Sequence, residues 1–167
     1  YCIVPAVRGP ELYRPAAGIL EEVRKKVSEG CREVTLLGQT VNSWRSEFEG
    51  RSVDFGGLLR LADRIEGLER VRFMSPHPYY ITDGLLSALA ETRTATRWLH
   101  LPVQSGSNRL LRLMRRNYTR EGFLEKTERV RRAVPGIVLS TDFIVGFPSE
   151  TEEDFQQTLS LASAFKP

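Results

Sequence analysis

The chain has 167 residues, of which 41% are hydrophobic and 27% are charged. This composition is typical of a folded domain and excludes a disordered chain. No apolar run is long enough for a membrane-spanning helix, and a net charge of +3 does not by itself indicate a nucleic-acid-binding protein. The length fits one domain, but it is short for a complete eight-unit α/β barrel, which needs roughly 250 residues.

The cysteines bear on the cellular compartment. Two cysteines, Cys2 and Cys31, cannot form a disulfide framework, and we therefore expect a reducing, cytoplasmic environment. Their separation does not exclude a single bridge between them. Cys31 stands at a helix–strand junction and is predicted to be a small buried hydrophobe. The chain starts at Tyr1 without an initiator methionine, so we expect it to be an excerpt of a longer protein.

Helices and short apolar strands alternate along the chain. Hydrophobic spacing predicts four strands, near residues 33–38, 70–74, 97–102 and 137–145. Helices are expected over 15–29 and 54–66 and after the N-cap residues Thr82, Ser107, Thr119 and Thr151. The polar stretch from Gln39 to Val53 is expected to be a loop. Strands that alternate with helices imply parallel βαβ units. The predicted fold is therefore α/β, a partial (β/α) barrel with a parallel sheet and outer helices.

Ligands of such folds bind beyond the carboxyl ends of the strands. There the sequence places Gly38 with Gln39, Ser75, Gln104, and Asp142 with Gly146. The glycines either turn the chain or let the backbone approach a ligand, and the polar side chains either hydrogen-bond a ribose or cap a helix. No Ser-His-Asp set or carboxylate pair accompanies them, so we predict no catalytic side chain in this segment.

The histidines and the basic residues each allow two interpretations. His77 lies between two prolines and either ligates a metal or, as we predict, stabilises its loop. His100 lies between two leucines and is predicted to be a packed core residue. From Arg109 to Arg132 there are nine Lys or Arg against three Glu. This stretch is either a solvated helix face or a phosphate-contacting face. These patterns predict a polar ligand site but no reaction.

Several longer strings resemble one known family, the radical S-adenosylmethionine methylthiotransferases. The likeness covers essentially the whole chain, in one order, and is greatest to the branch that methylthiolates isopentenyladenosine next to the tRNA anticodon. The strings that carry it are Tyr1–Pro5, Arg8–Gly9, Arg14–Pro15, Glu33–Trp44, His100–Ser107, Met114–Thr119, Asp142–Pro148 and Glu150–Thr151.

The resemblance implies an incomplete cluster site. In this family a C-x3-C-x2-C run holds a [4Fe–4S] cluster through three thiolates and leaves one iron open for S-adenosylmethionine. Cys2 matches the third cysteine, and the first two would precede Tyr1. Residues 1–167 would then be an incomplete radical SAM barrel. The first barrel strand, an N-terminal domain with a second cluster and a C-terminal RNA-binding domain would lie outside the chain.

The resemblance also assigns cofactor-binding roles to the strand ends. Gly38 and Gln39 would lie near the methionine amino group, with Ser75 as a further polar contact. Gln104 and Asp142 would face the ribose.

Three later residues would complete this set. Arg116 would pair with the carboxylate of S-adenosylmethionine, as a bidentate guanidinium can. Ile144 and Gly146 would pack beside the adenine. The glutamate that usually follows three residues after this glycine is replaced by Ser149, and Glu150 comes next.

The implied function is the addition of a methylthio group to C2 of the tRNA adenosine, with a reductant such as flavodoxin or ferredoxin and no membrane partner. The cofactor would carry the difficult step, which agrees with the lack of an acid–base set. A methylthiotransferase acting on a ribosomal-protein aspartate and a non-catalytic RNA-binding module are the alternatives. An ordinary metabolic barrel enzyme fits the sequence least well.

Overall fold

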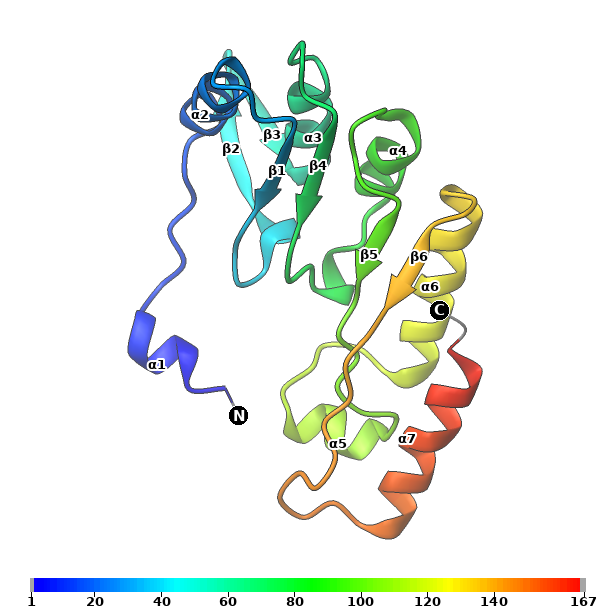
Figure 1. Cartoon of the computed structure of the whole chain (residues 1–167). Coiled ribbons are helices and arrows are strands. Elements are labelled where there is room, and N and C mark those ends of the chain that lie inside the picture. The colour runs from blue at the N-terminus through cyan, green and yellow to red at the C-terminus, as the bar shows by residue number, and fades with distance from the viewer. Residues whose placement is uncertain (1, 166–167) are drawn as a thin grey trace.

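The structure, a computed structural model, describes residues 2–165 of the chain. Four short strands lie side by side and point the same way (Figure 1), namely β1 (Glu33–Leu36), β4 (Arg70–Phe73), β5 (Trp98–His100) and β6 (Val138–Ser140). β1 pairs with β4 and β5 with β6, both in parallel. A parallel bridge between Val71 and Ala95 joins the two pairs. The predicted parallel sheet of a partial barrel is therefore confirmed.

The helices follow the strands as the sequence predicts. They are α2 (Ala16–Ser28), α3 (Phe55–Asp63), α4 (Asp83–Glu91), α5 (Asn108–Leu113), α6 (Arg120–Ala133) and α7 (Glu152–Ala164), with the short turns η1 (Val41–Ser43) and η2 (Pro78–Tyr80). A further short helix, α1 (Val4–Arg8), was not predicted. Every helix in the described part of the chain is too short or too polar to cross a membrane.

Hydroxyl caps fix where four of these helices begin. Each of the predicted cap side chains accepts a hydrogen bond from the backbone N–H three residues later, which satisfies a donor that the first turn leaves unpaired. The caps are Thr82, Ser107, Thr119 and Thr151. At α7 the cap is reciprocal, because Asp154 accepts from the backbone of Thr151 in return.

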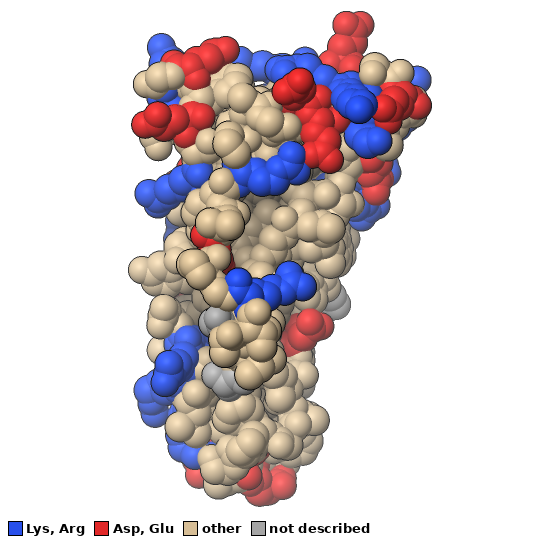
Figure 2. All heavy atoms as spheres, turned by 90° about the vertical axis from the view of Figure 1, so that its left-hand side faces the viewer, with Lys and Arg blue, Asp and Glu red and all other residues tan. Residues whose placement is uncertain are grey.

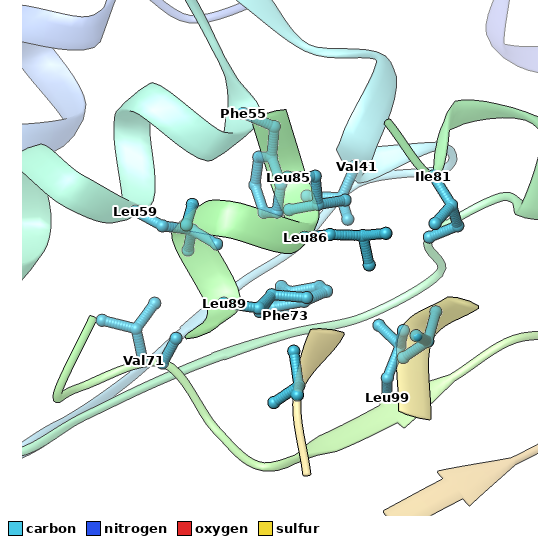
Figure 3. Packing of buried hydrophobic residues seen from close by; sticks show 14 of the residues in the cluster. Val41, Phe55, Leu59, Val71, Phe73, Ile81, Leu85, Leu86, Leu89 and Leu99 are labelled. Atoms are coloured by element: carbon cyan, nitrogen blue, oxygen red, sulfur yellow. The ribbon is translucent and has the colours of Figure 1, made fainter. Parts of the chain in front are cut away.

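The core lies on one face of the sheet. Side chains alternate along each strand, and the alternate positions Val71, Phe73, Leu99 and Leu139 are buried. They pack against apolar side chains of the covering helices, such as Leu59 of α3 and the α4 leucines (Figure 3). The intervening residues form the open face of the sheet, which we define as Glu33, Thr35, Arg70, Arg72, Trp98, His100, Val138 and Ser140.

The last strand is shorter than predicted. β6 ends at Ser140, and beyond it the chain adds only one bridge, between Gln104 and Phe143. The reason lies in the partner segment, where Pro102 has no N–H to donate to the ladder. Val103 N instead donates to the hydroxyl of Thr141, 3.0 Å away.

The stretch from Gln39 to Val53 is not simply a loop. It contains η1 and an antiparallel hairpin of β2 (Arg45–Phe48) and β3 (Arg51–Asp54). Glu49 and Gly50 form its two-residue turn, with φ angles of 52° and 72°, as tight hairpins require. The prediction of a loop was wrong here because the hairpin is polar and half exposed, which leaves almost no period-2 hydrophobic signal.

Candidate functional site

Four loops meet at the carboxyl edge of the sheet. Because the parallel strands end on the same side (Figure 1), the segments that follow them converge. Gly38 and Gln39 follow β1, and Ser75 follows β4. Gln104 and Asp142 lie beyond β5 and β6. The fold thus gathers at one edge the residues that the sequence singled out.

Left-handed backbone conformations occur in the segments that connect the strands and helices. Five described non-glycine residues have left-handed φ angles, and one of them is in the β2–β3 turn. The other four follow β4, β5, α5 and β6, and they are Ser75 (57°), Gln104 (76°), Arg115 (52°) and Ser149 (68°). Such conformations cost on the order of 1–3 kcal/mol each and cluster at functional sites. Two of these residues, Ser75 and Gln104, lie in loops at the carboxyl edge, so the backbone supports the selection of those two loops.

Gln104, Asp142 and Ile144 are brought together by the backbone. Gln104 N donates to Asp142 O at 3.0 Å, and Ile144 N donates to Gln104 O at 2.7 Å. The Gln104 side-chain amide makes no hydrogen bond to any described residue. It therefore keeps both a donor and an acceptor for a ligand.

His100 orients the Asp142 carboxylate. Its Nδ1 lies 2.9 Å from Ser140 Oγ, and its Nε2 lies 3.1 Å from Asp142 Oδ2. The imidazole also stacks on Trp98, with ring centroids 5.9 Å apart. The prediction of a core histidine was wrong, because Leu99 points to the helices and strand alternation turns its neighbour to the open face. The Asp142 side chain is 66% exposed, so it remains accessible to a ligand.

A glycine turn follows the Asp142 segment. Gly146 has a φ angle of 72°, and its N–H donates to the Glu150 carboxylate. The second carboxylate oxygen, Oε1, is buried and has no hydrogen-bond partner among the described residues. One carboxylate oxygen of Glu150 thus holds this loop together, and the other can accept a hydrogen bond from a ligand.

The loop after β4 is held by a side chain that the sequence analysis did not select. Asn42, which is buried, donates to His77 O at 3.0 Å and accepts from His77 N at 2.7 Å. This reciprocal pair ties the loop after β1 to the loop after β4. Asn42 lies in a polar stretch of the sequence, close to Thr40 and Ser43, so its residue type alone does not distinguish it from its neighbours.

His77 stabilises its loop, as predicted. Its Nδ1 accepts a hydrogen bond from Tyr79 N at 3.2 Å. Burial, with the nearby charges of Arg116 and Lys126, lowers the pKa of His77 from 6.5 to about 4. The ring is therefore neutral at neutral pH.

Gly38 and Gln39 line the rim of a different hollow. It has a volume of about 580 Å³ and runs between the 11–14 segment, α2 and β1. None of the other predicted cofactor residues lines it. Figure 2 shows the side of the molecule that lies on the left in Figure 1, where charges of both signs gather at the upper end and uncharged surface predominates below. The structure therefore does not join these two residues to the Gln104 group in one cavity.

Helix α7 supports the loop that carries Gln104. Gly106 N donates to Thr158 Oγ1 at 3.0 Å, and Ser107 Oγ donates to the buried Asp154. The Arg109 guanidinium also binds Asp154 and, with the Ser107 and Thr151 hydrogen bonds, holds the pKa of that carboxyl well below its usual range. This buried network could not be predicted from the sequence, because its two halves lie some forty-five residues apart.

Eight of the nine basic residues from Arg109 to Arg132, all except Arg116, fall into two groups. Arg109, Arg120, Lys126, Arg129 and Arg131 bind carboxylates or backbone carbonyls within the chain. Arg112, Arg115 and Arg132 are exposed and form no ion pair with any described residue. Much of this stretch therefore stabilises the fold, and the second group carries charges that no described carboxylate neutralises.

The thiols of both cysteines are exposed and free. The prediction that Cys31 is buried was wrong, because the turn after α2 leaves the residue on the surface. Within residues 2–165, no three His, Cys, Asp or Glu side chains come together as metal ligands. Cys2 can supply one thiolate to a cluster but not a complete site.

The chain was compared with known proteins. The model of the Radical SAM superfamily matches residues 1–162. A tRNA-2-methylthio-N(6)-dimethylallyladenosine synthase of Thermobifida fusca is 56% identical over 159 residues, which cover 95% of this chain and 32% of that protein. A protein of the same name from Geobacter sulfurreducens is 53% identical over 161 residues, or 96% of this chain and 36% of that protein. The chain spans about a third of the length of these relatives.

Proposed function

The chain belongs to the radical SAM superfamily, and from that premise we propose that it is part of an enzyme that methylthiolates C2 of N6-isopentenyladenosine next to the tRNA anticodon. The observation that carries this proposal is the identity of more than half of the residues to synthases named for this modification. Because those relatives are about three times longer, we assign residues 1–167 to the catalytic barrel and place the other domains outside the chain.

The polar groups at the carboxyl edge suit the adenosyl part of S-adenosylmethionine. The Gln104 amide, the exposed Asp142 carboxylate and the second Glu150 oxygen are hydrogen-bonding groups that lack a full set of partners among residues 2–165. We assign Gln104 and Asp142 to the ribose. Ile144 and Gly146 would line the adenine, and Glu150 adds an acceptor for its amino group.

The remaining cofactor residues belong to the methionine part. We assign Arg116 to its carboxylate, since a guanidinium forms two parallel hydrogen bonds with such a group. Gly38, Gln39 and Ser75 would meet the amino group. Cys2 would be one of three thiolate ligands of a [4Fe–4S] cluster, which suits its exposed, unbonded sulfur.

The bound cluster and S-adenosylmethionine would supply the radical chemistry that opens the adenine C2–H bond. The residues of this chain bind and orient. His100 fixes the direction of Asp142 through the 3.1 Å contact, and α7 fixes the loop of Gln104. No described side chain is needed as an acid or base, which agrees with the lack of such a set. Electrons would come from a reductant such as flavodoxin or ferredoxin.

The proposal is tested with the full-length protein, purified and reconstituted without oxygen. With reductant and S-adenosylmethionine, it should convert isopentenyladenosine in tRNA to the 2-methylthio nucleoside, detected by mass spectrometry of digested tRNA. The ribosomal-protein aspartate is offered in a parallel reaction. Modification of the protein substrate alone would overturn the tRNA assignment.

Cys2 has a matched control within the chain. Cys2→Ser should lower the iron content by one cluster and abolish cleavage of S-adenosylmethionine, because one thiolate ligand is lost. Cys31→Ser removes the other exposed thiol and should leave both unchanged. Equal iron loss in the two variants would count against the ligand assignment.

A further inference from the structure

A second, smaller pocket opens beside the cofactor residues. Its volume is about 200 Å³, and its wall includes residues of the loops after β1 and β4 and of the segment after α5, among them Thr40, Ser43, His77, Tyr79, Tyr80 and Asn117. None of the assigned cofactor residues lines it. However, Thr40 directly follows Gln39 and Asn117 directly follows Arg116. A group bound here would therefore lie next to the cofactor and not in its place.

The wall of this pocket is firmly held. The Asn42 side chain forms two hydrogen bonds with the backbone of His77. Lys126 of α6 donates to the carbonyls of Pro78 and Tyr79 at 2.8 and 3.2 Å. The pocket is therefore largely formed before any ligand binds, which reduces the entropy cost of binding.

Aromatic rings and unused polar groups face a prospective ligand together. Tyr79 and Tyr80 are 52% and 36% exposed, and their rings meet edge to face with centroids 5.1 Å apart. The neutral His77 ring accepts from Tyr79 N at Nδ1, so its proton lies on Nε2, which has no partner among the described residues. The Asn117 amide likewise makes no hydrogen bond to a described residue.

The charges beside the pocket favour a polyanion. The Lys126 ammonium lies 5.6 Å from the centroid of the Tyr79 ring. Arg116 is close enough to affect His77. Glu11 is the one acid among the lining residues, and it accepts a hydrogen bond from Tyr13. Rings next to cationic side chains are the pattern by which proteins stack unpaired bases while the phosphates follow the positive charge.

We propose that this pocket binds one unpaired base of the substrate RNA, adjacent to the adenosine that reacts. The inference rests on the proposed function and names a recognition element within it. A volume of about 200 Å³ is below the roughly 300–1,000 Å³ of sites that enclose a whole small molecule. It suits a single ring system whose sugar and phosphate stay outside.

The test is a cycle that combines protein variants with RNA variants. Full-length enzyme is titrated with an anticodon stem-loop RNA and with a series in which one loop base at a time is replaced by an abasic site. Tyr79→Ala, Tyr80→Ala and Asn117→Ala should each weaken binding of the intact RNA roughly three- to thirtyfold, whereas Tyr79→Phe should not. At one loop position, removal of the base should weaken wild-type binding by a similar factor and leave the variants unaffected.

Controls separate this inference from the function on which it rests. Leu159→Ala removes an exposed apolar side chain on α7 and should leave every affinity unchanged. Independent, additive losses at all loop positions, or unchanged RNA affinity in the three alanine variants, would overturn the pocket assignment while methylthiolation by the wild type continues. Failure of the proposed function would appear differently, as the absence of tRNA modification and of RNA binding by the wild-type enzyme.

Discussion

At the scale of residues, two adjacent arginines that follow α5, Arg115 and Arg116, make the cofactor assignment testable. Of the two, only Arg116 has a charge that acts on the pKa of His77. Arg115 is exposed and has a left-handed backbone. The pair therefore separates the proposed contact of Arg116 with the cofactor from the effect of surface charge.

We expect Arg116→Ala to weaken binding of S-adenosylmethionine while cluster content stays intact. A charge-assisted hydrogen bond contributes on the order of 1.5–3 kcal/mol, which corresponds to roughly ten- to hundredfold in affinity. Isothermal titration of the reconstituted enzyme measures this, with Arg115→Ala as the control. Equal losses of cofactor affinity in the two variants would refute the assignment of Arg116.

Titration of His77 should make the stability of the protein depend on pH. The pKa of His77 is lowered to about 4 in the folded protein, against 6.5 when unfolded. Between these values the unfolded chain binds a proton that the folded chain does not. Stability from this group is therefore complete above pH 6.5 and falls as the pH drops toward 4.

The measurement is urea unfolding of wild type and His77→Gln across this range. The glutamine oxygen can still accept from Tyr79 N but does not titrate. We expect the wild-type free energy of unfolding to fall more steeply below pH 6.5 than that of the variant. Parallel profiles would show that the imidazole is not buried as a neutral group.

At the scale of elements, the sequence predicted best those features that depend only on residues close together in the chain. The hydroxyl caps at Thr82, Ser107, Thr119 and Thr151 were all recognised, because a cap needs only a residue type and the backbone that follows it. The β2–β3 hairpin and the contact between the Gln104 loop and α7 were not. Both depend on partners that no local period reveals.

The candidate site likewise contains some residues that the sequence could reveal and others that it could not. Glycines and polar residues at strand ends could be selected from the sequence, since topology places strand ends together. The Asn42 clamp and the Asp142–His100 pair could not, because each joins residues about forty positions apart. Strand alternation could have shown that His100 lies on the opposite face of the sheet from its leucine neighbours.

Gly106 tests how closely the Gln104 loop packs on α7. A Cβ atom at this position would lie 2.3 Å from Gln157 O and 2.5 Å from Thr158 Cα. We therefore expect Gly106→Ala to destabilise the protein by roughly 1–3 kcal/mol, as overpacking does, and to weaken binding of S-adenosylmethionine.

Gly18→Ala is the comparison for Gly106→Ala. Gly18 lies within α2, and a Cβ there would meet nothing within 4 Å. This variant should gain up to about 1 kcal/mol from helix propensity. Thermal unfolding of both variants measures these changes in stability. If Gly106→Ala is as stable as the wild type, the loop and the helix are not in such close contact.

At the scale of the whole molecule, the distribution of charge is more informative than its sum. A net charge of +3 says little about binding of RNA. Exposed arginines without ion pairs differ in this respect from arginines whose charge is already paired within the protein. Arg129 binds Asp83 at 2.6 Å, whereas Arg115 has no such partner among the described residues. An arginine without an ion pair can bind an RNA phosphate and release its counterion without first losing a partner within the protein.

We expect Arg115→Ala to lower tRNA affinity and to reduce the slope of log affinity against log salt by about one. Arg129→Ala should change the slope far less and act mainly on stability. Filter-binding titrations at several salt concentrations give both slopes. If Arg129→Ala flattens the slope as much as Arg115→Ala does, intramolecular pairing does not decide which arginines meet the RNA.

The β2–β3 hairpin has a practical consequence for labelling. Its turn at Glu49 and Gly50 is exposed and lies at the end of the sheet opposite to the carboxyl edge (Figure 1). Maleimide dyes are unsuitable for an enzyme whose cluster needs its thiolates, because the chemistry that attaches them would attack the same sulfurs. A short peptide tag inserted between these two residues would carry a fluorophore through enzymatic ligation instead. Such a reporter could follow the approach of RNA in single-molecule experiments without altering the surface that receives it.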